Sequence, residues 1–437
     1  MQAELSKLLK RPRVHASATA GLGSVFVATG DLHLKAGGRM ALVLPKALLS
    51  GVAWEQTRHL FRLRYQLEYI IASHDPERWN FSENTDLSEV LIVARKVDDP
   101  HAVAPPEGDV VCLNLWKNPT TIVEALSVAH SLNNAYPPDI ATGQGAHEVM
   151  LGDVKFGEVV TIPWVDIREG SWMPPCAFAQ SDLLRVAHHL VKGNLYLPGA
   201  GITGKVTLCP LQQLGDLGPD RRDIHDGFRL AKIVTAYPAL WGHDASAMAN
   251  LALTPNQYLS PLHRAKAGRH LRNADLLWPK AGRLVLAERL RLNTQRLVAV
   301  RMETPVLSNV WWPVRLLEQN DNCEKALALW LNSTLGLFIL LSRREETQGA
   351  WVDFKKPVLA ETPVLDVRAL GVDQMKYLVG AYNTLSKRPL LPFPKMANDP
   401  VRKAMDAAVS KALGLPDLSV LRNLLGQEPV VCLRALS

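Results

Sequence analysis

The chain has 437 residues, of which 47% are hydrophobic and 21% charged, and its formal net charge at pH 7 is +7. This length exceeds one ordinary domain, so we expect two or three domains, and the hydrophobic content suffices for a sizeable core. Because cations that neutralise phosphates release counterions, the positive charge favours a polyanionic partner. The sequence contains no internal repeat or low-complexity tract, which excludes a repeat architecture.

The cysteines exclude two further classes of protein. They are Cys112, Cys176, Cys209, Cys323 and Cys432. Since they are odd in number, scattered and without Cys-x-x-Cys spacing, neither a disulfide framework nor a zinc site is indicated, and a reducing cytoplasm is expected. The first residues are polar and charged, and no run approaches the roughly 20 apolar residues that cross a bilayer. We therefore expect a cytoplasmic protein with no membrane partner and no metal site.

The first hundred residues alternate between helical and strand patterns. We expect a helix near 22–34, a strand at 39–44 stopped by Pro45, a helix at 47–65, and strands at 67–72 and 89–94. The last two strands are separated by the loop 75–86, which contains Trp79 and Phe81. This alternation predicts part of an α/β sheet.

Later segments are more mixed. Aspartate, proline and glycine residues between 98 and 108 mark a linker or exposed loop, and a helix is expected near 120–132. From 183 to 363, short strands such as 283–288 and 297–301 alternate with Gly- and Pro-rich turns, and a helix at 323–341 interrupts them. About the last sixty residues favour helix, with 401–413 as the clearest amphipathic stretch.

The most specific signal is the segment 34–49 (LKAGGRMALVLPKALL) followed by the segment 79–96 (WNFSENTDLSEVLIVARK). The first segment is a turn followed by a buried strand, and open α/β sheets bind their ligands at the carboxyl ends of such strands. The second segment is a loop that contains Phe81, followed by a strand that re-enters the sheet. Over roughly residues 20–96, this order resembles the downstream half of the gamma-type, adenine-specific DNA methyltransferases of restriction-modification and phage-defence systems.

The resemblance implies an α/β fold, in which a partial Rossmann-like methyltransferase sheet is followed by a mixed α+β target-recognition domain and a helical C-terminus. It implies transfer of a methyl group from S-adenosylmethionine to the amino nitrogen of adenine, with double-stranded DNA as partner. The aromatic residue matched by Phe81 stacks on the flipped base in that family, because the amino group is unreachable inside a duplex. The alternative is that Phe81 is a core aromatic anchoring its loop. Trp79 lies outside the matched position.

A looser likeness to the specificity domains of the same enzymes covers residues 328–359. A helix containing ALWLNSTLGLF precedes Gly349-Ala350-Trp351 and Lys355-Lys356-Pro357, and the likeness implies that Trp351, Lys355 and Lys356 approach DNA. The expected divisions are 1–100 for the end of the catalytic domain, 101–165 for a connecting segment, 166–375 for target recognition and 376–437 for the helical C-terminus.

Independently of any family, the segment 263–301 is strongly basic. We expect DNA contacts from Arg264, Arg269, Arg272, Lys280, Arg283, Arg289 and Arg291. The segment also contains the cations Lys266, Arg296 and Arg301, and its acidic residues are only Asp275 and Glu288. Interleaved His, Asn, Gln and Trp residues add base-reading chemistry to phosphate neutralisation. The alternative is a solvated basic face. A second cluster, Arg221-Arg222-Asp223 with His225 nearby, is a weaker signal because Asp223 can simply pair with an arginine.

One glycine-rich motif is discounted. The segment 199–205 (GAGITGK) combines dinucleotide-type and phosphate-loop spacings, but Val206 replaces the Ser or Thr that would hold magnesium. We interpret the motif as a glycine-rich turn. The remaining reading, a nucleotide-hydrolysing protein, would need ATP binding that depends on Lys205.

The motifs that the family carries upstream of the matched region are missing. They are a glycine-containing loop for S-adenosylmethionine and an Asn-Pro-Pro-Tyr-type tetrapeptide. The strings 134–138 (NAYPP) and 173–175 (MPP) have the wrong order and follow the matched region, and 21–23 (GLG) directly precedes its strand. The cofactor-binding residues therefore stay unassigned.

Three explanations remain for the missing motifs: a truncated gene product, one subunit of a split enzyme completed by an upstream methyltransferase polypeptide, or a paralogue that kept DNA binding and lost catalysis. In each case we expect the isolated chain to be inactive. An incomplete sheet would also leave an unpaired strand edge and exposed apolar surface for a partner to cover. The rival function is a non-catalytic DNA-binding or specificity subunit of a restriction or phage-defence complex.

Overall fold

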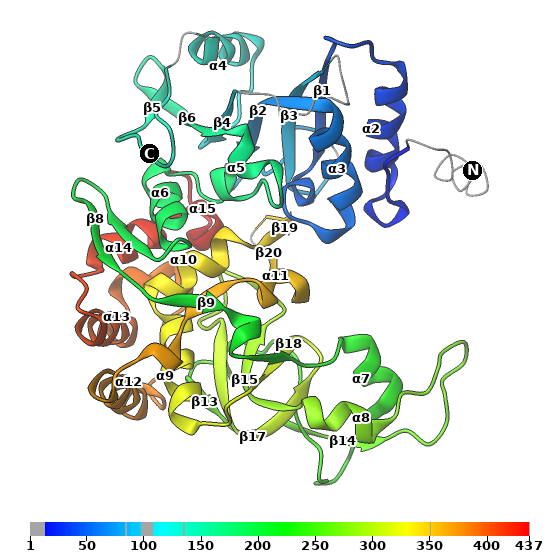
Figure 1. Ribbon diagram of the computed structural model, residues 1–437, viewed down its shortest axis with the longest axis vertical. Coiled ribbons are helices and arrows are strands. Elements are labelled where there is room, and N and C mark those ends of the chain that lie inside the picture. The colour runs from blue at the N-terminus through cyan, green and yellow to red at the C-terminus, as the bar shows by residue number, and fades with distance from the viewer. Residues whose placement is uncertain (1–13, 84, 98–107, 134–135, 350, 437) are drawn as a thin grey trace. The chain divides into compact units, whose positions relative to one another are not determined.

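The computed structural model describes residues 14–83, 85–97, 108–133, 136–349 and 351–436 (Figure 1). The chain divides into two compact units, each made of segments that are distant in the sequence. Unit 1 comprises Met1–His188, Ser342–Trp351 and Glu428–Ser437, and unit 2 comprises His189–Leu341 and Val352–Gln427. Helices and strands alternate in both, so the α/β class expected from the sequence is confirmed.

Unit 1 is built on a six-stranded mixed sheet of order β1-β3-β2-β4-β6-β5. Its strands are β1 (Arg39–Pro45), β2 (Tyr65–Ser73), β3 (Glu89–Lys96), β4 (Asp109–Leu115), β5 (His147–Leu151) and β6 (Val154–Pro163). Strand β3 is antiparallel to both β1 and β2, and β4 is parallel to β2. The strands β1, β2 and β4 therefore run in one direction, and their carboxyl ends lie at the same end of the sheet.

The division of the chain differs from the boundaries expected at residues 100 and 165. Because β4 pairs with β2 and β6 pairs with β4, the residues from 109 to 163 extend the sheet of unit 1 instead of forming a connecting segment. The part of the expected linker at 98–107 lies outside the described residues. Unit 1 also takes ten residues, Ser342–Trp351, from within the expected target-recognition region.

The helices expected in the first half of the chain are present, with one exception. The α-helices are α2 (Leu22–His33), α3 (Glu55–Arg64), α4 (Ile122–Asn133), α5 (Trp164–Arg168) and α6 (Ser181–Leu190). The helix expected at 47–65 is interrupted at Gly51, where a Cβ atom would lie 2.6 Å from the carbonyl oxygen of Ala47. Its first part consists of the short 3₁₀ helices η2 (Lys46–Leu49) and η3 (Val52–Trp54).

Unit 2 contains an eight-stranded sheet of order β10-β18-β15-β17-β12-β14-β11, with β13 also paired to β17. These strands are β10 (Gly215–Leu217), β11 (Phe228–Leu230), β12 (Pro238–Leu240), β13 (Ala252–Leu253), β14 (Gln257–Pro261), β15 (Gly282–Ala287), β17 (Ala299–Ser308) and β18 (Trp311–Leu316). The strands predicted at 283–288 and 297–301 correspond to β15 and the beginning of β17.

Short strands complete the unit. They are β7 (Asn194–Leu197), β8 (Gly201–Lys205), β9 (Leu208–Pro210), β16 (Arg289–Arg291), β20 (Trp351–Asp353) and β21 (Pro363–Leu365), while β19 (Glu345–Gln348) belongs to unit 1. The pair β7 and β8 forms a hairpin, and Gly199 and Gly201 at its turn have φ angles of 76° and 75°. Left-handed backbone favours glycine, so the interpretation of the segment 199–205 as a glycine-rich turn is confirmed.

The C-terminal residues are mostly helical, as expected, and further helices lie among the strands of the second half of the chain. These α-helices are α7 (Arg221–Gly227), α8 (Ala274–Leu277), α9 (Asp321–Asn332), α10 (Thr334–Ser342), α11 (Lys356–Ala360), α12 (Val372–Leu385), α13 (Pro400–Leu413), α14 (Ser419–Gln427) and α15 (Pro429–Cys432). The remaining 3₁₀ helices are η1 (Ala18–Ala20), η4 (Pro174–Cys176), η5 (Leu211–Gln213), η6 (Trp278–Lys280), η7 (Val367–Ala369) and η8 (Phe393–Asn398).

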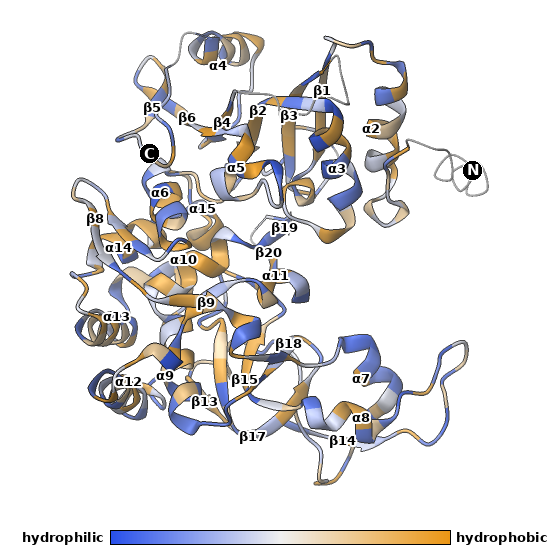
Figure 2. Ribbon diagram, viewed as in Figure 1, coloured by the Kyte–Doolittle hydropathy of each residue, from blue (hydrophilic) through white to orange (hydrophobic). Residues whose placement is uncertain are grey.

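The single helix expected at 323–341 is instead the pair α9 and α10, bent by 72° at Ser333. The bend has a long-range cause, because Asp406 on α13 accepts hydrogen bonds from the N–H and the hydroxyl of Thr334, at 2.8 and 2.7 Å. These bonds begin a new helix at Thr334. Hydrophobic residues cover most of α10 (Figure 2). Within the described residues no single helix is long and apolar enough to span a membrane, and only this bent pair reaches that length and composition.

Candidate functional site

The carboxyl ends of β1, β2 and β4 in unit 1 form the first candidate site, because open α/β sheets bind ligands at this end of their strands. The loop 74–88 joins β2 to β3 across this end. Asn118, just after β4, fixes the loop: its Nδ2 donates to the carbonyl oxygens of Arg78 and Asn80 at 2.8 and 2.9 Å. Its own N–H donates to Asp75 Oδ2 at 3.1 Å. The loop is thus held at both β2 and β4.

Phe81 lies in this loop at the position expected from the resemblance. Its N–H and that of Ser82 donate to Glu89 Oε2, at 2.9 and 2.8 Å, so the first residue of β3 holds the backbone around Phe81. The ring is half-buried and packs against a hydrophobic cluster between the sheet and α4. This packing corresponds to the alternative of an anchoring aromatic, and contact of Phe81 with a base stays a prediction.

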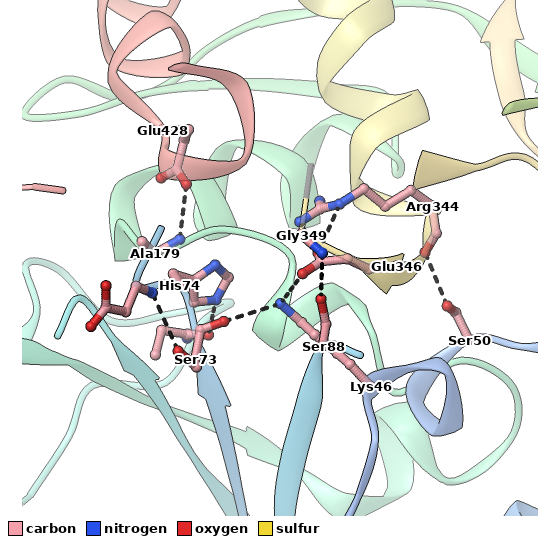
Figure 3. A network of polar contacts seen from close by, with 12 residues as sticks. Lys46, Ser50, Ser73, His74, Ser88, Ala179, Arg344, Glu346, Gly349 and Glu428 are labelled. Atoms are coloured by element: carbon pink, nitrogen blue, oxygen red, sulfur yellow. Dashed lines mark hydrogen bonds and ion pairs between the residues drawn. The ribbon is translucent and has the colours of Figure 1, made fainter. Parts of the chain in front are cut away.

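A segment from the second half of the chain borders the same loop. In unit 1, the N–H of Ser88 donates to the carbonyl oxygen of Thr347 at 3.1 Å. The N–H of Gly349 donates to Ser88 Oγ at 2.9 Å (Figure 3). A Cβ atom at Gly349 would lie 3.2 Å from Nε1 of Trp79, so glycine allows the close approach of the two segments. The expected DNA-contacting residue Trp351 is half-buried at the beginning of β20, and Ala350 lies outside the described residues.

Charged groups at this end of the sheet pair with one another. Lys46 follows β1, is fully buried, and places Nζ 2.9 Å from Glu346 Oε1, while Arg344 Nη2 lies 2.8 Å from Glu346 Oε2 (Figure 3). Burial raises the pKa of Glu346, but the charges of Lys46 and Arg344 outweigh it and the pKa is lowered. Sequence reasoning missed this group, since only Lys46, a cation directly after an apolar strand, gave a signal.

His74, the first residue of the loop, is buried beside this group. Its Nε2 lies 3.0 Å from Asn114 Oδ1, and Nδ2 of Asn114 donates to the carbonyl oxygen of Pro175 at 3.0 Å. Burial, followed by the charges of Lys46 and Arg344, holds the pKa of His74 well below its usual value. The imidazole is therefore neutral at pH 7 and supports the loop without adding charge.

The glycine-containing segments singled out in the sequence do not form a loop for S-adenosylmethionine. Gly23 lies within α2, where a Cβ atom would meet the ring of Trp54 at 3.0 Å, so this glycine serves helix packing. The glycines of the segment 199–205 form a hairpin turn. Of the string 134–138, residues 134–135 lie outside the described residues, and the carbonyl of Pro138 accepts from the N–H of Thr161 on β6. None of these segments forms a glycine loop between a strand and a helix.

The second candidate site is a cationic surface of unit 2, where the exposed loop 263–272 lies against α7. Lys266 Nζ donates to the carbonyl oxygen of His225 at 2.5 Å, and Arg269 Nη1 lies 2.9 Å from Asp226 Oδ1. Partial burial, followed by the charges of Arg221, Lys266 and Arg269, lowers the pKa of His225. We call Arg221, Lys266 and Arg269 the α7 basic surface.

Besides Arg269, two further expected DNA-contacting residues lie near this surface. Arg264 is exposed in the same loop, and Arg272 places Nε 2.9 Å from Asp223 Oδ1. The pairing of Asp223 with an arginine is confirmed. The same contacts bring the weaker sequence cluster at 221–225 next to the stronger one at 263–272, which sequence reasoning kept apart.

A smaller group of cations lines a pocket of about 380 Å³ in unit 2. Lys280 and Lys356 reach it from η6 and α11, and Arg315 reaches it from β18, against Asp216 as the acidic residue of the lining. Lys356 Nζ also donates to the carbonyl oxygen of Gly218 at 2.8 Å. Two expected DNA-contacting residues that are distant in the sequence thus share one pocket.

The other expected residues occupy different surroundings. Arg283 Nε lies 2.9 Å from Glu324 Oε2, and Arg301 Nε lies 3.1 Å from the same atom. Arg289 and Lys355 both approach Asp353 Oδ1, at 3.8 and 3.7 Å, and Arg291 is exposed on β16. The segment 263–301 therefore does not form one continuous face, and Arg283 belongs to an ion cluster that joins β15, β17 and α9.

No protein-family model and no curated protein matches the chain. Among solved structures, the chain is similar to the type IIG restriction endonuclease BpuSI, with 13% sequence identity and a TM-score of 0.38. The match covers 98% of this chain and 51% of the other, so the chain spans about half the length of that enzyme.

Proposed function

We propose that the chain is the DNA-binding component of an adenine-specific DNA methyltransferase that a second polypeptide completes. The observation that carries the proposal is the insertion of β3 between β1 and β2, which places the Phe81 loop at the carboxyl ends of parallel strands. The resemblance to gamma-type methyltransferases implies a loop with Phe81 followed by a strand that re-enters the sheet, and β3 is that strand. The substrate is double-stranded DNA, and the reaction is methylation of the adenine amino nitrogen.

Phe81 is the proposed stacking residue for the flipped adenine. Stacking and hydrogen bonds to the base must offset the cost of unstacking it from the duplex. The ring of Phe81 is half-buried on a firmly held backbone, so a base can approach its open side without reordering the loop. Asn118 and Glu89 act as positioning residues, because they hold the backbone of the loop that carries Phe81.

The proposed grip on the duplex comes from unit 2. The α7 basic surface and the pocket of Lys280, Lys356 and Arg315 offer cations from separate elements, which suits phosphates spaced along a strand. Such contacts set position and affinity, while sequence is read by other groups. DNA affinity should therefore fall steeply with salt.

S-adenosylmethionine would supply the methyl group, and its site would lie on the completing polypeptide. The glycines of the segments 21–23 and 199–205 lie in a helix and in a hairpin, and neither segment is a glycine loop between a strand and a helix. The same observation, with the packing of Phe81 against its cluster, favours a second function: a non-catalytic DNA-binding subunit of a restriction or phage-defence complex.

Radiolabelled methyl transfer to mixed-sequence DNA distinguishes these functions. The chain is assayed alone and with the product of the reading frame immediately upstream, and DNA binding is followed in parallel at several salt concentrations. We expect transfer only in the mixture. Methyl transfer by the chain alone would overturn the proposal that a second polypeptide completes the enzyme. Salt-sensitive DNA binding without transfer in any combination would establish the non-catalytic subunit.

A further inference from the structure

Strand β1 has a free hydrogen-bonding edge among the described residues, because it pairs with β3 on one side and stands at the end of the strand order. Hydrogen bonds at both ends of β1 show which of its residues are bonded to β3. The N–H of Lys96 donates to the carbonyl oxygen of Gly38 at 2.8 Å, and the N–H of Lys46 donates to the carbonyl oxygen of Ser88 at 2.7 Å. In an antiparallel pair such bonds recur at every second residue. The even-numbered residues of β1 therefore face β3.

The odd-numbered residues direct their peptide groups outward. The outward N–H and C=O groups belong to Arg39, Ala41 and Val43, and all three residues are exposed. Their side chains alternate with those of Met40 and Leu44, which are buried. Between Arg39 and Lys46 the strand carries no charge. Natural sheet edges are usually protected by charged residues or bulges. This edge has only Arg39, at its first position, whose side chain pairs with Glu68 of β2, and its pairing with β3 contains no bulge.

The opposite edge of the same sheet shows the usual protection. Strand β5 carries Glu148, which pairs with Lys155 of β6 at 2.6 Å, and its pairing with β6 contains a bulge between Val149 and Met150. The two edge strands therefore differ. Strand β5 has the protection that is typical of an edge strand, whereas the uncharged residues from Met40 to Leu44 of β1 are typical of an interior strand.

Helix α2 points to the same conclusion. One side packs on the sheet and on α3: Gly30 lies against Met40, and Ser24 Oγ lies 2.8 Å from Thr57 Oγ1. The other side exposes Leu22, Phe26 and Leu32, with 68% of Phe26 accessible. Figure 2 shows hydrophobic residues along α2, which Figure 1 shows beside β1. Exposed apolar side chains grouped on one side of a helix are typical of an interaction surface.

The direction of the missing strand follows from the arrangement. Helix α2 leads directly into β1 and lies on one face of the sheet, which is how the helix of a strand-helix-strand unit enters its second strand. The first strand of such a unit is parallel to the second, and the helix covers both. The exposed side of α2 is then placed to cover a strand next to β1. Two copies of this chain joined by a twofold axis would instead pair β1 antiparallel to itself.

From these observations we infer that β1 accepts a parallel strand from a second polypeptide, whose apolar residues also cover Leu22, Phe26 and Leu32 of α2. This inference rests on the proposed function for the identity of that polypeptide as the completing methyltransferase component. Main-chain hydrogen bonds supply affinity in such strand addition, and the apolar contacts supply specificity.

Amide hydrogen exchange at single-residue resolution tests the inference. In the isolated full chain, the amides of Ala41 and Val43 should exchange fast and those of Leu42 and Leu44 slowly. Addition of the product of the upstream reading frame should protect Ala41 and Val43. Protection of these two amides in the isolated monomer, or in a dimer of this chain alone, would overturn the inference.

Binding of the same polypeptide to edge variants provides the second measurement. V43K and F26E should each weaken binding by about tenfold or more, whereas M150K, on the protected edge, should leave it unchanged. No binding, or equal binding by all variants, would overturn the docking site. Protection and variant effects without methyl transfer would uphold the docking site and remove the proposed activity. Methyl transfer by mixtures that contain V43K or F26E, at the wild-type rate, would uphold the proposed activity and overturn the docking site.

Discussion

Lys46 and Glu346, separated by 300 residues in the sequence, form a fully buried ion pair with Nζ 2.9 Å from Oε1. Arg344 shares the same carboxylate, with Nη2 at 2.8 Å from Oε2. One anion therefore neutralises two buried cations. The pair joins the ten-residue segment Ser342–Trp351 to the carboxyl end of β1 within unit 1. It lies next to the loop 74–88, because the N–H of Lys46 donates to the carbonyl oxygen of Ser88 at 2.7 Å.

This sharing predicts an asymmetry between two substitutions. E346Q removes the carboxylate that pairs with both Lys46 and Arg344, whereas K46M leaves Arg344 paired with Glu346. Breaking a buried pair costs on the order of 3–5 kcal/mol, and we expect E346Q to reach that range and K46M to cost less. Urea unfolding of both variants measures the difference. An equal or larger loss for K46M would contradict the assignment of Glu346 as the common partner.

Glu428 should make stability depend on pH. Burial raises its pKa to about 7, although its carboxylate accepts hydrogen bonds from the N–H groups of Ala179 and Gln180, both at 3.1 Å. The folded-state pKa exceeds the unfolded value of about 4.3, so the stability associated with the protonated group is present below about pH 4 and lost as the pH rises through about 7.

The variant E428Q removes this titration and keeps an oxygen acceptor. Relative to the wild type, E428Q should gain on the order of 3 kcal/mol in unfolding free energy between about pH 4 and about pH 8. Thermal unfolding of both proteins across this range gives the comparison. A difference between them that does not change with pH would show that Glu428 titrates normally.

The α7 basic surface should control the salt dependence of DNA binding. Replacing Arg221, Lys266 and Arg269 by alanine should weaken binding across sequences and reduce the slope of log affinity against log salt by up to about three. R283A is the matched control, since Arg283 is in an ion cluster with Glu324 and its loss should lower stability and leave the slope unchanged. A changed slope for R283A with an unchanged slope for the triple variant would reverse the assignment.

The bend between α9 and α10 depends on Asp406. Its carboxylate accepts from Thr334 and pairs with Arg422 Nη1 at 2.8 Å, and both charged side chains are buried. D406A should destabilise the chain by about 3–5 kcal/mol, because it leaves Arg422 buried and unpaired. D417A, an exposed acidic residue before α14, should cost less than about 1 kcal/mol. Urea midpoints within error of each other for the two variants would contradict this role.

Hydrophobic patterns in the sequence correctly predicted the helices and strands that depend on their own residues. The strands at 39–44 and 89–94 and the helices at 22–34 and 120–132 have strong periodicity or apolar runs, and all are present. The break at Ser333 was missed because its cause, Asp406, lies far along the chain. The extension of the sheet through β4 was missed because pairing with β2 is not encoded within the segment itself.

The candidate sites show the same limit. The position of Phe81 before a re-entering strand followed from the sequence order, and the structure places its loop at the expected end of the sheet. Three features depend on tertiary contacts: the pairing of Lys46 with Glu346, the approach of Gly349 to Trp79, and the contacts of α7 with the loop 263–272. A count of charges therefore identified the basic segment but could not separate Arg269, on a surface, from Arg283, in an ion cluster.

Methyl transfer by mixtures that contain Phe81 variants tests the central claim most directly. The chain is combined with the product of the upstream reading frame and labelled S-adenosylmethionine, as wild type, F81A, F81W and L132A. Leu132 packs in the same cluster as Phe81, so L132A reports loss of packing alone. The account predicts transfer by wild type and L132A, retention by F81W and a loss of about a hundredfold or more in F81A. Equal rates for F81A and L132A, or no transfer by any mixture, would contradict it.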